Sequence, residues 1–149
     1  MVAFTMDESD VRGFMNRLLR EDPFDAFEVK AAELYALTRV DISGAQDGVE
    51  EKRNVVWREL KPLVTALIKC KMPRLIKIIF SLSAGEAESL HPNASALFIN
   101  MVYENGGIAF TSGTSQKQFA LDKSLDERWD AYVADFFSRH EIPVKIKIQ

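Results

Sequence analysis

The sequence predicts an α+β fold: a mainly antiparallel sheet of five to six strands, with about three helices packed mostly on one face. Two apolar runs within residues 96–121 flank Asn105-Gly106, a dipeptide typical of hairpin turns because both turn positions need positive φ. Residues 11–19 and 125–137 carry apolar side chains at helical spacing. Hairpins and short links between the remaining strands make neighbouring strands antiparallel.

The bulk composition is that of an ordinary globular protein. The chain has 149 residues, of which 47% are hydrophobic and 28% charged, so we expect a single domain over residues 1–149. Its one cysteine, Cys70, excludes an intramolecular disulfide and fits a reducing compartment. The first ten residues lack the basic and apolar regions of a signal peptide. We therefore expect a bacterial, cytoplasmic protein.

The first predicted helix follows a capping-box pattern, Thr5-Met6-Asp7-Glu8. Asp22-Pro23 should end this helix, because the residue before proline avoids the helical region. One apolar face is formed by Val11, Phe14, Met15, Leu18 and Leu19.

Residues 27–42 are predicted to form a long strand. The alternation of apolar residues changes parity near Ala32-Glu33, so either a β-bulge or a break into two strands is required. A short helix over residues 30–37 is the competing interpretation, because alanine, glutamate, lysine and leucine favour helices.

A polar loop is expected over residues 43–53, with Gly44 and Gly48, and a second helix then runs to about Cys70. Pro62 should either kink this helix or start a new one. Trp57 is expected to be exposed. The predicted apolar stripe consists of Val56, Leu60, Leu63, Leu67 and Ile68.

The second half of the chain opens with a strand over residues 75–82 that is apolar on both sides, which favours a central position in the sheet. Residues 83–91 form a short helical turn or a loop. The hairpin follows, and residues 116–121 are predicted to form a further strand.

The last predicted helix begins with a second capping box, Ser124-Leu125-Asp126-Glu127. Residues 142–148 should then form an edge strand, with Val144, Ile146 and Ile148 buried and lysines outward. The helix carries an aromatic stripe that we expect in the core: Trp129, Tyr132, Phe136 and Phe137.

Four segments of the sequence carry a family resemblance. They are F-M-N-R-L-L-R-E-D-P-F-D-A-F (14–27), L-I-K-C-K-M-P (67–73), T-S-G-T-S (111–115) and L-D-K-S-L-D-E-R-W-D (121–130). The order and spacing of these four segments resemble those of a family of domains of unknown function from Gram-positive, clostridia-like bacteria. The resemblance implies a compact bacterial protein and supplies no substrate, cofactor or catalytic residue. It also implies glycine in place of Cys70, so the thiol is not a family function.

Charge is distributed unevenly although the net charge is only −3. Residues 1–51 carry a net charge of −7, residues 52–77 a net charge of +7, and residues 78–149 a net charge of −3. The negative total disfavours nucleic acid as a partner, and the basic block is the main electrostatic feature.

The sequence contains few residues that are candidates for catalysis, metal binding or cofactor binding. His91 and His140 lie far apart without helically spaced partners, so we expect no metal site. Cys70 stands between Lys69 and Lys71, but a nucleophilic thiol also needs a base, and an incidental thiol is the simpler interpretation. Phosphate-binding and dinucleotide motifs are absent from the sequence, and we expect no cofactor.

The candidate binding site lies in the basic block. We predict an anion site in which cationic side chains share a rim with hydroxyl groups. Its members are Lys69, Lys71, Arg74, Lys77, Thr111, Ser112, Thr114 and Ser115. The competing interpretation is that the lysines complement a helix dipole and the hydroxyls form a polar strand face.

The favoured hypothesis is a non-enzymatic domain that binds a protein partner or an anionic small molecule through residues 52–77. One alternative is an enzyme for a phosphorylated or carboxylated small molecule, with an acid or base among Asp25, Glu28 and Glu33. Another is a structural or assembly protein that uses the C-terminal edge strand. We expect no membrane association, because no apolar run approaches the ~20 residues of a membrane helix.

Overall fold

The computed structural model describes residues 1–46 and 53–147, so Gly48, Lys52 and Ile148 lie outside the described residues. The described chain contains seven strands and four helices, which confirms the α+β class but exceeds the predicted five to six strands and about three helices. In order, these are β1 (Ala3–Met6), α1 (Glu8–Arg20), β2 (Glu28–Tyr35), β3 (Arg39–Ser43), α2 (Trp57–Cys70), β4 (Leu75–Ser81), α3 (Ala84–Leu90), β5 (Ala94–Glu104), β6 (Gly107–Gln116), α4 (Ser124–Arg139) and β7 (Lys145–Lys147).

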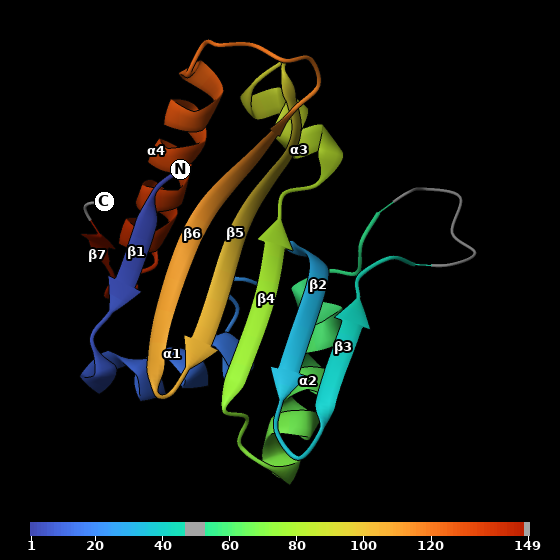
Figure 1. The fold of residues 1–149 in the computed structure, drawn as a ribbon, viewed down its shortest axis with the longest axis vertical. Coiled ribbons are helices and arrows are strands. Elements are labelled where there is room, and N and C mark those ends of the chain that lie inside the picture. The colour runs from blue at the N-terminus through green and yellow to red at the C-terminus, as the bar shows by residue number, and fades with distance from the viewer. Residues whose placement is uncertain (47–52, 148–149) are drawn as a thin grey trace.

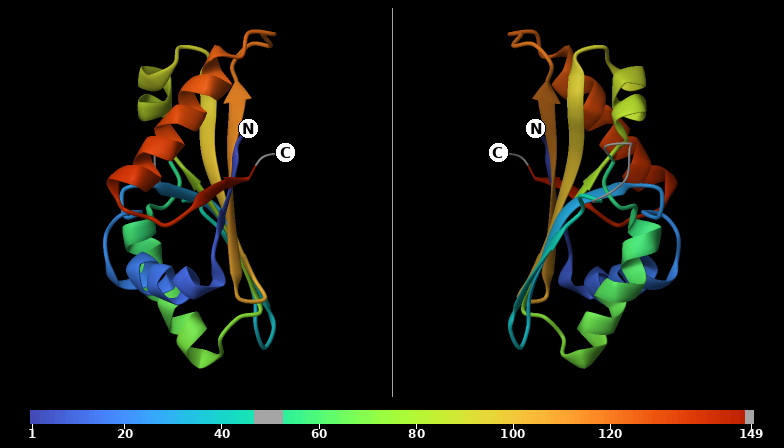
Figure 2. Two further views of the ribbon diagram at one scale, coloured as in Figure 1. Left: turned by 90° about the vertical axis from the view of Figure 1, so that its left-hand side faces the viewer. Right: turned by 90° about the vertical axis from the view of Figure 1, so that its right-hand side faces the viewer.

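All seven strands belong to one antiparallel sheet with the order β3-β2-β4-β5-β6-β1-β7. The four helices cover the same face, and the opposite face is open (Figures 1 and 2). Strand β4 lies between β2 and β5, which confirms the central position predicted from its two apolar sides.

The β5–β6 hairpin predicted from the sequence is present, and its two strands are the longest of the described sheet. Asn105 and Gly106 have φ values of 51° and 79°, which are the positive values that the two-residue turn needs. The further strand predicted at residues 116–121 is wrong. Strand β6 ends at Gln116, and the chain continues as a loop to α4.

The N-terminus forms a strand that the sequence analysis missed. Thr5 lies in β1 opposite Ala109 of β6, and α1 begins at Glu8 with Asp7 as its N-cap. The capping box assigned to Thr5 is therefore wrong. Phe4 and Met6 are buried while Thr5 between them is only half-buried, a period-2 pattern that fits a strand better than a helix start.

Residues 27–42 break into two strands, one of the two options that the parity change allowed. Strands β2 and β3 form a hairpin, and the register of β2 against β4 shifts between Val29 and Ala31. The competing helix over residues 30–37 is wrong. A side chain at Gly44 would come within 1.6 Å of the Val29 carbonyl oxygen, so only glycine fits beside this bulge.

Helix α2 is continuous and contains Pro62 in its interior. Trp57 was expected to be exposed but is fully buried, whereas Leu63 was assigned to the buried stripe and is 52% exposed. The buried face of α2 consists of Trp57, Leu60 and Val64. Leu60 belongs to both sets, so the predicted stripe overlapped the buried face but was displaced from it by about one residue.

Of the two options predicted for residues 83–91, the short helical turn is present as α3, whereas the ends of the later elements differ from the predictions. Ser83 caps α3, because its hydroxyl accepts a hydrogen bond from the Glu86 amide. At α4 the predicted capping box is wrong: Ser124 is the first helical residue and donates its amide and hydroxyl to the Asp122 carboxylate. Strand β7 is at the sheet edge as predicted, but Ile146 is 62% exposed instead of buried.

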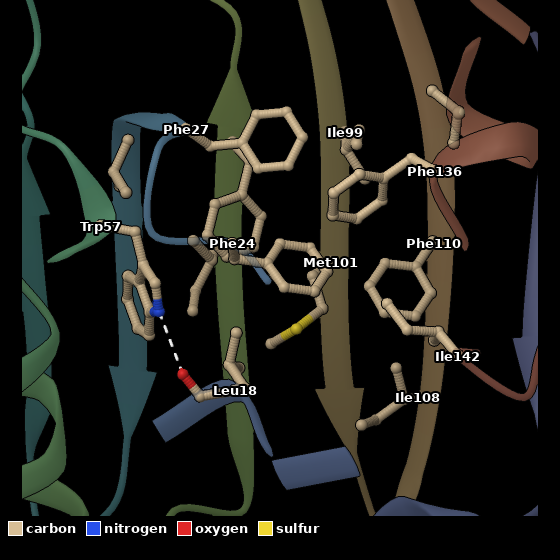
Figure 3. Close-up of a cluster of buried hydrophobic side chains, with 14 of the residues drawn as sticks. Leu18, Phe24, Phe27, Trp57, Ile99, Met101, Ile108, Phe110, Phe136 and Ile142 are labelled. Carbon is tan, nitrogen blue, oxygen red and sulfur yellow. Dashed lines mark hydrogen bonds between the residues drawn. The ribbon is translucent and has the colours of Figure 1, made fainter. Parts of the chain in front are cut away.

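The core lies between the helices and the covered face of the sheet (Figure 3). Phe24, from the link after α1, packs against Phe80 and Phe136 with ring centroids 4.8 and 5.2 Å away. The aromatic stripe of α4 was expected in the core, and this is confirmed for Trp129, Phe136 and Phe137.

Candidate functional site

The cationic members of the predicted anion site separate into two locations. Lys69 ends the last turn of α2, and Lys71 and Arg74 lie in the link to β4, all three exposed. Lys77 instead lies on the open face of the sheet, opposite Glu33 of β2. The structure thus keeps three of the four cations together at one end of the molecule.

The hydroxyl members alternate between the two faces of β6. Ser112 and Thr114 point to the helix-covered face and donate to the carboxylates of Asp130 and Asp126. Thr111 accepts a hydrogen bond from the Asn100 amide on the open face. The eight predicted residues therefore do not form one continuous site. In addition, the hydroxyl groups of Ser112 and Thr114 already donate their hydrogen bonds to carboxylates and cannot donate them to an anionic ligand. Anion binding by the cations stays a prediction.

The three carboxylates considered as acid or base all have structural partners. Asp25 pairs with Lys61 at 2.7 Å, and the carboxylate of Glu28 accepts the Asn54 amide at 2.9 Å. Glu33 lies 3.8 Å from the Arg39 guanidinium. These contacts connect β2 and the link before it to α2, to the segment before α2 and to β3. They give each carboxylate a structural role.

The histidines and the cysteine have local surroundings of their own. His91 accepts the Asn93 amide at Nδ1, and its Nε2 lies 3.0 Å from the Ser124 hydroxyl. The His140 ring packs on Phe136, and Cys70 is exposed. Among the described residues, no group of three or more histidine, cysteine or acidic residues could hold a metal ion.

An apolar cleft of about 440 Å³ lies beside the basic end of α2. We call it the α1–α2 cleft. Its lining comes from α1, from the end of α2 and from the β5–β6 hairpin: Glu8, Val11, Arg12, Met15, Asn16, Leu19, Ile68, Met72, Tyr103 and Gly106. Six of these ten residues present aliphatic, thioether or aromatic side chains, so the cleft can bury an apolar group.

The cleft lies between α1 and the C-terminal end of α2, and hydrogen bonds from the first half of α2 tie it to the end of α1. The buried indole of Trp57, at the start of α2, donates to the Leu18 carbonyl near the end of α1 at 3.1 Å (Figure 3). Lys61 reinforces the same end by donating to the Glu21 carbonyl at 3.0 Å. The cleft itself is lined by α1 from Glu8 to Leu19 and, across from it, by Ile68 in the last turn of α2 and Met72 in the link that follows.

Three polar side chains, Glu8, Arg12 and Asn16, belong to the lining of the cleft, and three exposed cations lie close in sequence to its apolar residues. Arg12 and Glu8 lie on the α1 side. Lys69, Lys71 and Arg74 flank Ile68 and Met72 along the chain, and the Arg74 carbonyl accepts the Asn105 amide from the hairpin turn. Met72 is 51% exposed, so an unbranched, adaptable side chain stands at the entrance.

Residues 17–145 match a family of unknown function, DUF5721. The chain belongs to this family. The matched region includes α2, the basic link and the β5–β6 hairpin, and it begins within α1. This agrees with the resemblance to a domain of unknown function stated from the sequence.

No curated protein and no solved structure matches the chain. Among the helices that the structure describes, none is long and apolar enough to cross a membrane.

The cleft itself was not visible in the sequence. Its walls come from segments that are almost a hundred residues apart, from Glu8 to Gly106. The one available signal was the basic block, which includes the end of α2 that lies beside the cleft. Met72 and Tyr103 carried no such signal, because in a sequence they cannot be distinguished from core residues.

Proposed function

We propose that this chain is a non-enzymatic binding module whose α1–α2 cleft takes an apolar group from a ligand or partner that also carries negative charge. The observation that carries this proposal is an apolar cleft whose lining includes the cation Arg12 and whose lining residues Ile68 and Met72 are next in sequence to the exposed cations Lys69 and Lys71. The volume of about 440 Å³ lies within the range of roughly 300–1,000 Å³ that is usual for ligand pockets.

Apolar burial and electrostatic attraction contribute to such binding in different ways. Apolar surface that leaves water contributes about 25 cal/mol per Å², which favours any well-fitting apolar group. Exposed cations add little to affinity, but they select anionic ligands and speed their approach. Binding should therefore depend on the apolar lining for affinity and on the basic residues for selectivity.

A titration with an anionic apolar dye, anilinonaphthalene sulfonate, tests the proposal. We expect saturable binding at one site per chain. Met72→Glu should weaken it about tenfold or more, because a carboxylate at the entrance repels the sulfonate and disfavours apolar contact. Lys69→Ala/Arg74→Ala should weaken the dye but spare an uncharged apolar probe.

Leu63→Glu is the matched control. Leu63 is 52% exposed and Met72 is 51% exposed, but Leu63 lies outside the cleft. The control should bind the dye like the unmodified chain. Equal loss in both variants, or no loss in either, would show that the cleft is not the binding site.

A further inference from the structure

The loop between β6 and α4 presents two large apolar side chains to solvent. Phe119 is 86% exposed and Leu121 is 82% exposed, and only one residue separates them. We call residues 117–123 the apolar loop. Isolated exposed apolar residues are common on protein surfaces, but two neighbours at the tip of one loop form a contact patch.

Hydrogen bonds hold this loop in one conformation. Gln116 exchanges two bonds with the Ala120 backbone, at 3.1 and 3.3 Å. Asn93, before β5, likewise exchanges two bonds with the Gln118 backbone, at 2.9 and 3.1 Å. Asp122 then accepts the Ser124 amide at 2.8 Å. The fixed backbone means that little conformational entropy is lost when the tip is buried.

The apolar loop lies at one end of the molecule, and the β5–β6 turn and the end of α2, which contribute to the lining of the α1–α2 cleft, lie at the other (Figure 1). Strand β6 connects them, because the loop follows its last residue, Gln116, and Gly106 of the cleft precedes its first residue. A strand of this length spans roughly 30 Å. Within one chain the loop therefore cannot reach the cleft, but it can reach the cleft of a neighbouring copy.

The two ends also carry opposite charge. At the loop end, α3, the apolar loop and residues 124–130 have a net charge of −3, from six acidic and three basic residues. The acidic residues are Glu86, Glu88, Asp122, Asp126, Glu127 and Asp130. At the cleft end, α1, residues 68–74 and residues 104–107 around the hairpin turn have a net charge of +3, from six basic and three acidic residues. The basic residues are Arg12, Arg17, Arg20, Lys69, Lys71 and Arg74.

From these observations we infer that the α1–α2 cleft receives the apolar loop of a second copy of this chain, so that copies associate head to tail. The inference rests on the cleft being a binding site, as proposed above, and it names the partner. Phe119 and Leu121 supply the apolar group, and the acidic surroundings of the loop face Arg12 and the other cations at the cleft end. The contact is heterologous: each copy keeps one free loop and one free cleft, and the chain of copies does not close unless the rotation permits a ring.

The contact is small, so association should be weak and should depend on concentration. Sedimentation velocity over a range from about 10 μM to about 1 mM tests it. We expect the average mass to rise from 16.9 kDa without stopping at the dimer. Phe119→Asp/Leu121→Asp and Met72→Glu should each remain monomeric, and Leu63→Glu should associate like the unmodified chain.

An equimolar mixture of the loop variant and the cleft variant gives the decisive result. One intact cleft and one intact loop remain in that mixture, so it should form a dimer and nothing larger. A mixture that stays monomeric, or a cleft variant that still dimerises by itself, would overturn the head-to-tail contact.

The outcomes also separate the two proposals. An unmodified chain that stays monomeric at every concentration, yet binds the dye in a Met72-dependent way, would retain the cleft as a binding site and reject the second copy as its occupant. If Met72→Glu changes neither dye binding nor mass, both proposals fail.

Discussion

Trp57 anchors α2 to α1 through a contact that serves both helices. Its side chain is fully buried, and its indole nitrogen donates to the Leu18 carbonyl at 3.1 Å. The last four carbonyl groups of a helix lack partners within that helix, and Leu18 is the third residue from the end of α1. The indole thus satisfies a buried acceptor that helix geometry leaves free.

Trp57→Phe should therefore destabilise the fold by more than the loss of buried apolar surface alone predicts. The unsatisfied carbonyl costs about 1–3 kcal/mol, and the space left by the smaller ring adds to this. Urea unfolding measures the free energy, with Leu63→Ala on the solvent side of α2 as a control that should change it by less than about 0.5 kcal/mol. A loss for Trp57→Phe no larger than for the control would refute this role.

The same residue shows where sequence patterns lose precision. Periodicity correctly predicted that α2 is amphipathic, but Trp57 and Leu63 were assigned to the wrong sides. Apolar residues occur on most sides of this helix, so the stripe was ambiguous by about one residue in phase. Only the tertiary contact with α1 selects the orientation that buries the indole.

Helix starts show a similar limit at the scale of elements. The segments beginning at Thr5, Ser83 and Ser124 stand before helices and match the same capping-box pattern, and of these three residues only Ser83 acts as an N-cap. Thr5 is taken by strand pairing with β6, and at Ser124 the helix starts one residue too early for its hydroxyl to serve as the cap. The pattern locates a helix start to within a few residues, and backbone hydrogen bonding determines which residue becomes the N-cap.

At α4, Asp122 supplies the contact that the sequence assigned to Ser124. The Ser124 backbone amide, and secondly its hydroxyl, donate to the carboxylate and hold the pKa of Asp122 below its ordinary value. A carboxyl whose pKa is lowered by folding stabilises the fold above its unfolded-state pKa. That contribution is lost as the pH falls through the lowered, folded-state value.

Ser124→Ala should consequently raise the pKa of Asp122 only part of the way toward its ordinary value, because the stronger backbone bond remains. An NMR titration of the Asp122 carboxyl carbon in both proteins measures this shift. An identical pKa in the variant would mean that the hydroxyl does not contribute, and a fully ordinary pKa would mean that the backbone bond depends on it.

For the whole molecule, the sequence predicted the fold class but not the order of the strands. Hairpins such as β5–β6 are local and carry turn signals, whereas β1 pairs with β6 and β7 across more than a hundred residues. No local pattern encodes such a pairing. The candidate cleft was hidden for the same reason, since its two walls meet only after Glu8 and Met72 are brought to one end of the sheet.

The sheet order leads to a hierarchy of stability across the molecule. Strands β4 and β5 have a neighbour on both sides and bury Ile76, Ile78 and Ile99 almost completely. Strand β7 spans only Lys145–Lys147, pairs with β1 alone and exposes all three side chains. Edge elements with few buried contacts open locally, at a cost far below that of global unfolding.

Hydrogen exchange should resolve this hierarchy. We expect β4 and β5 amides to exchange only through global unfolding, with rates that rise steeply in dilute urea because that opening exposes the whole core. The β7 amides should exchange much faster, at rates almost independent of urea, since local opening exposes little new surface. If β7 is as protected as β5 in dilute protein, its opening must be coupled to the core. If that protection appears only at high protein concentration, a second copy covers the edge, which would favour edge-strand assembly over the head-to-tail contact.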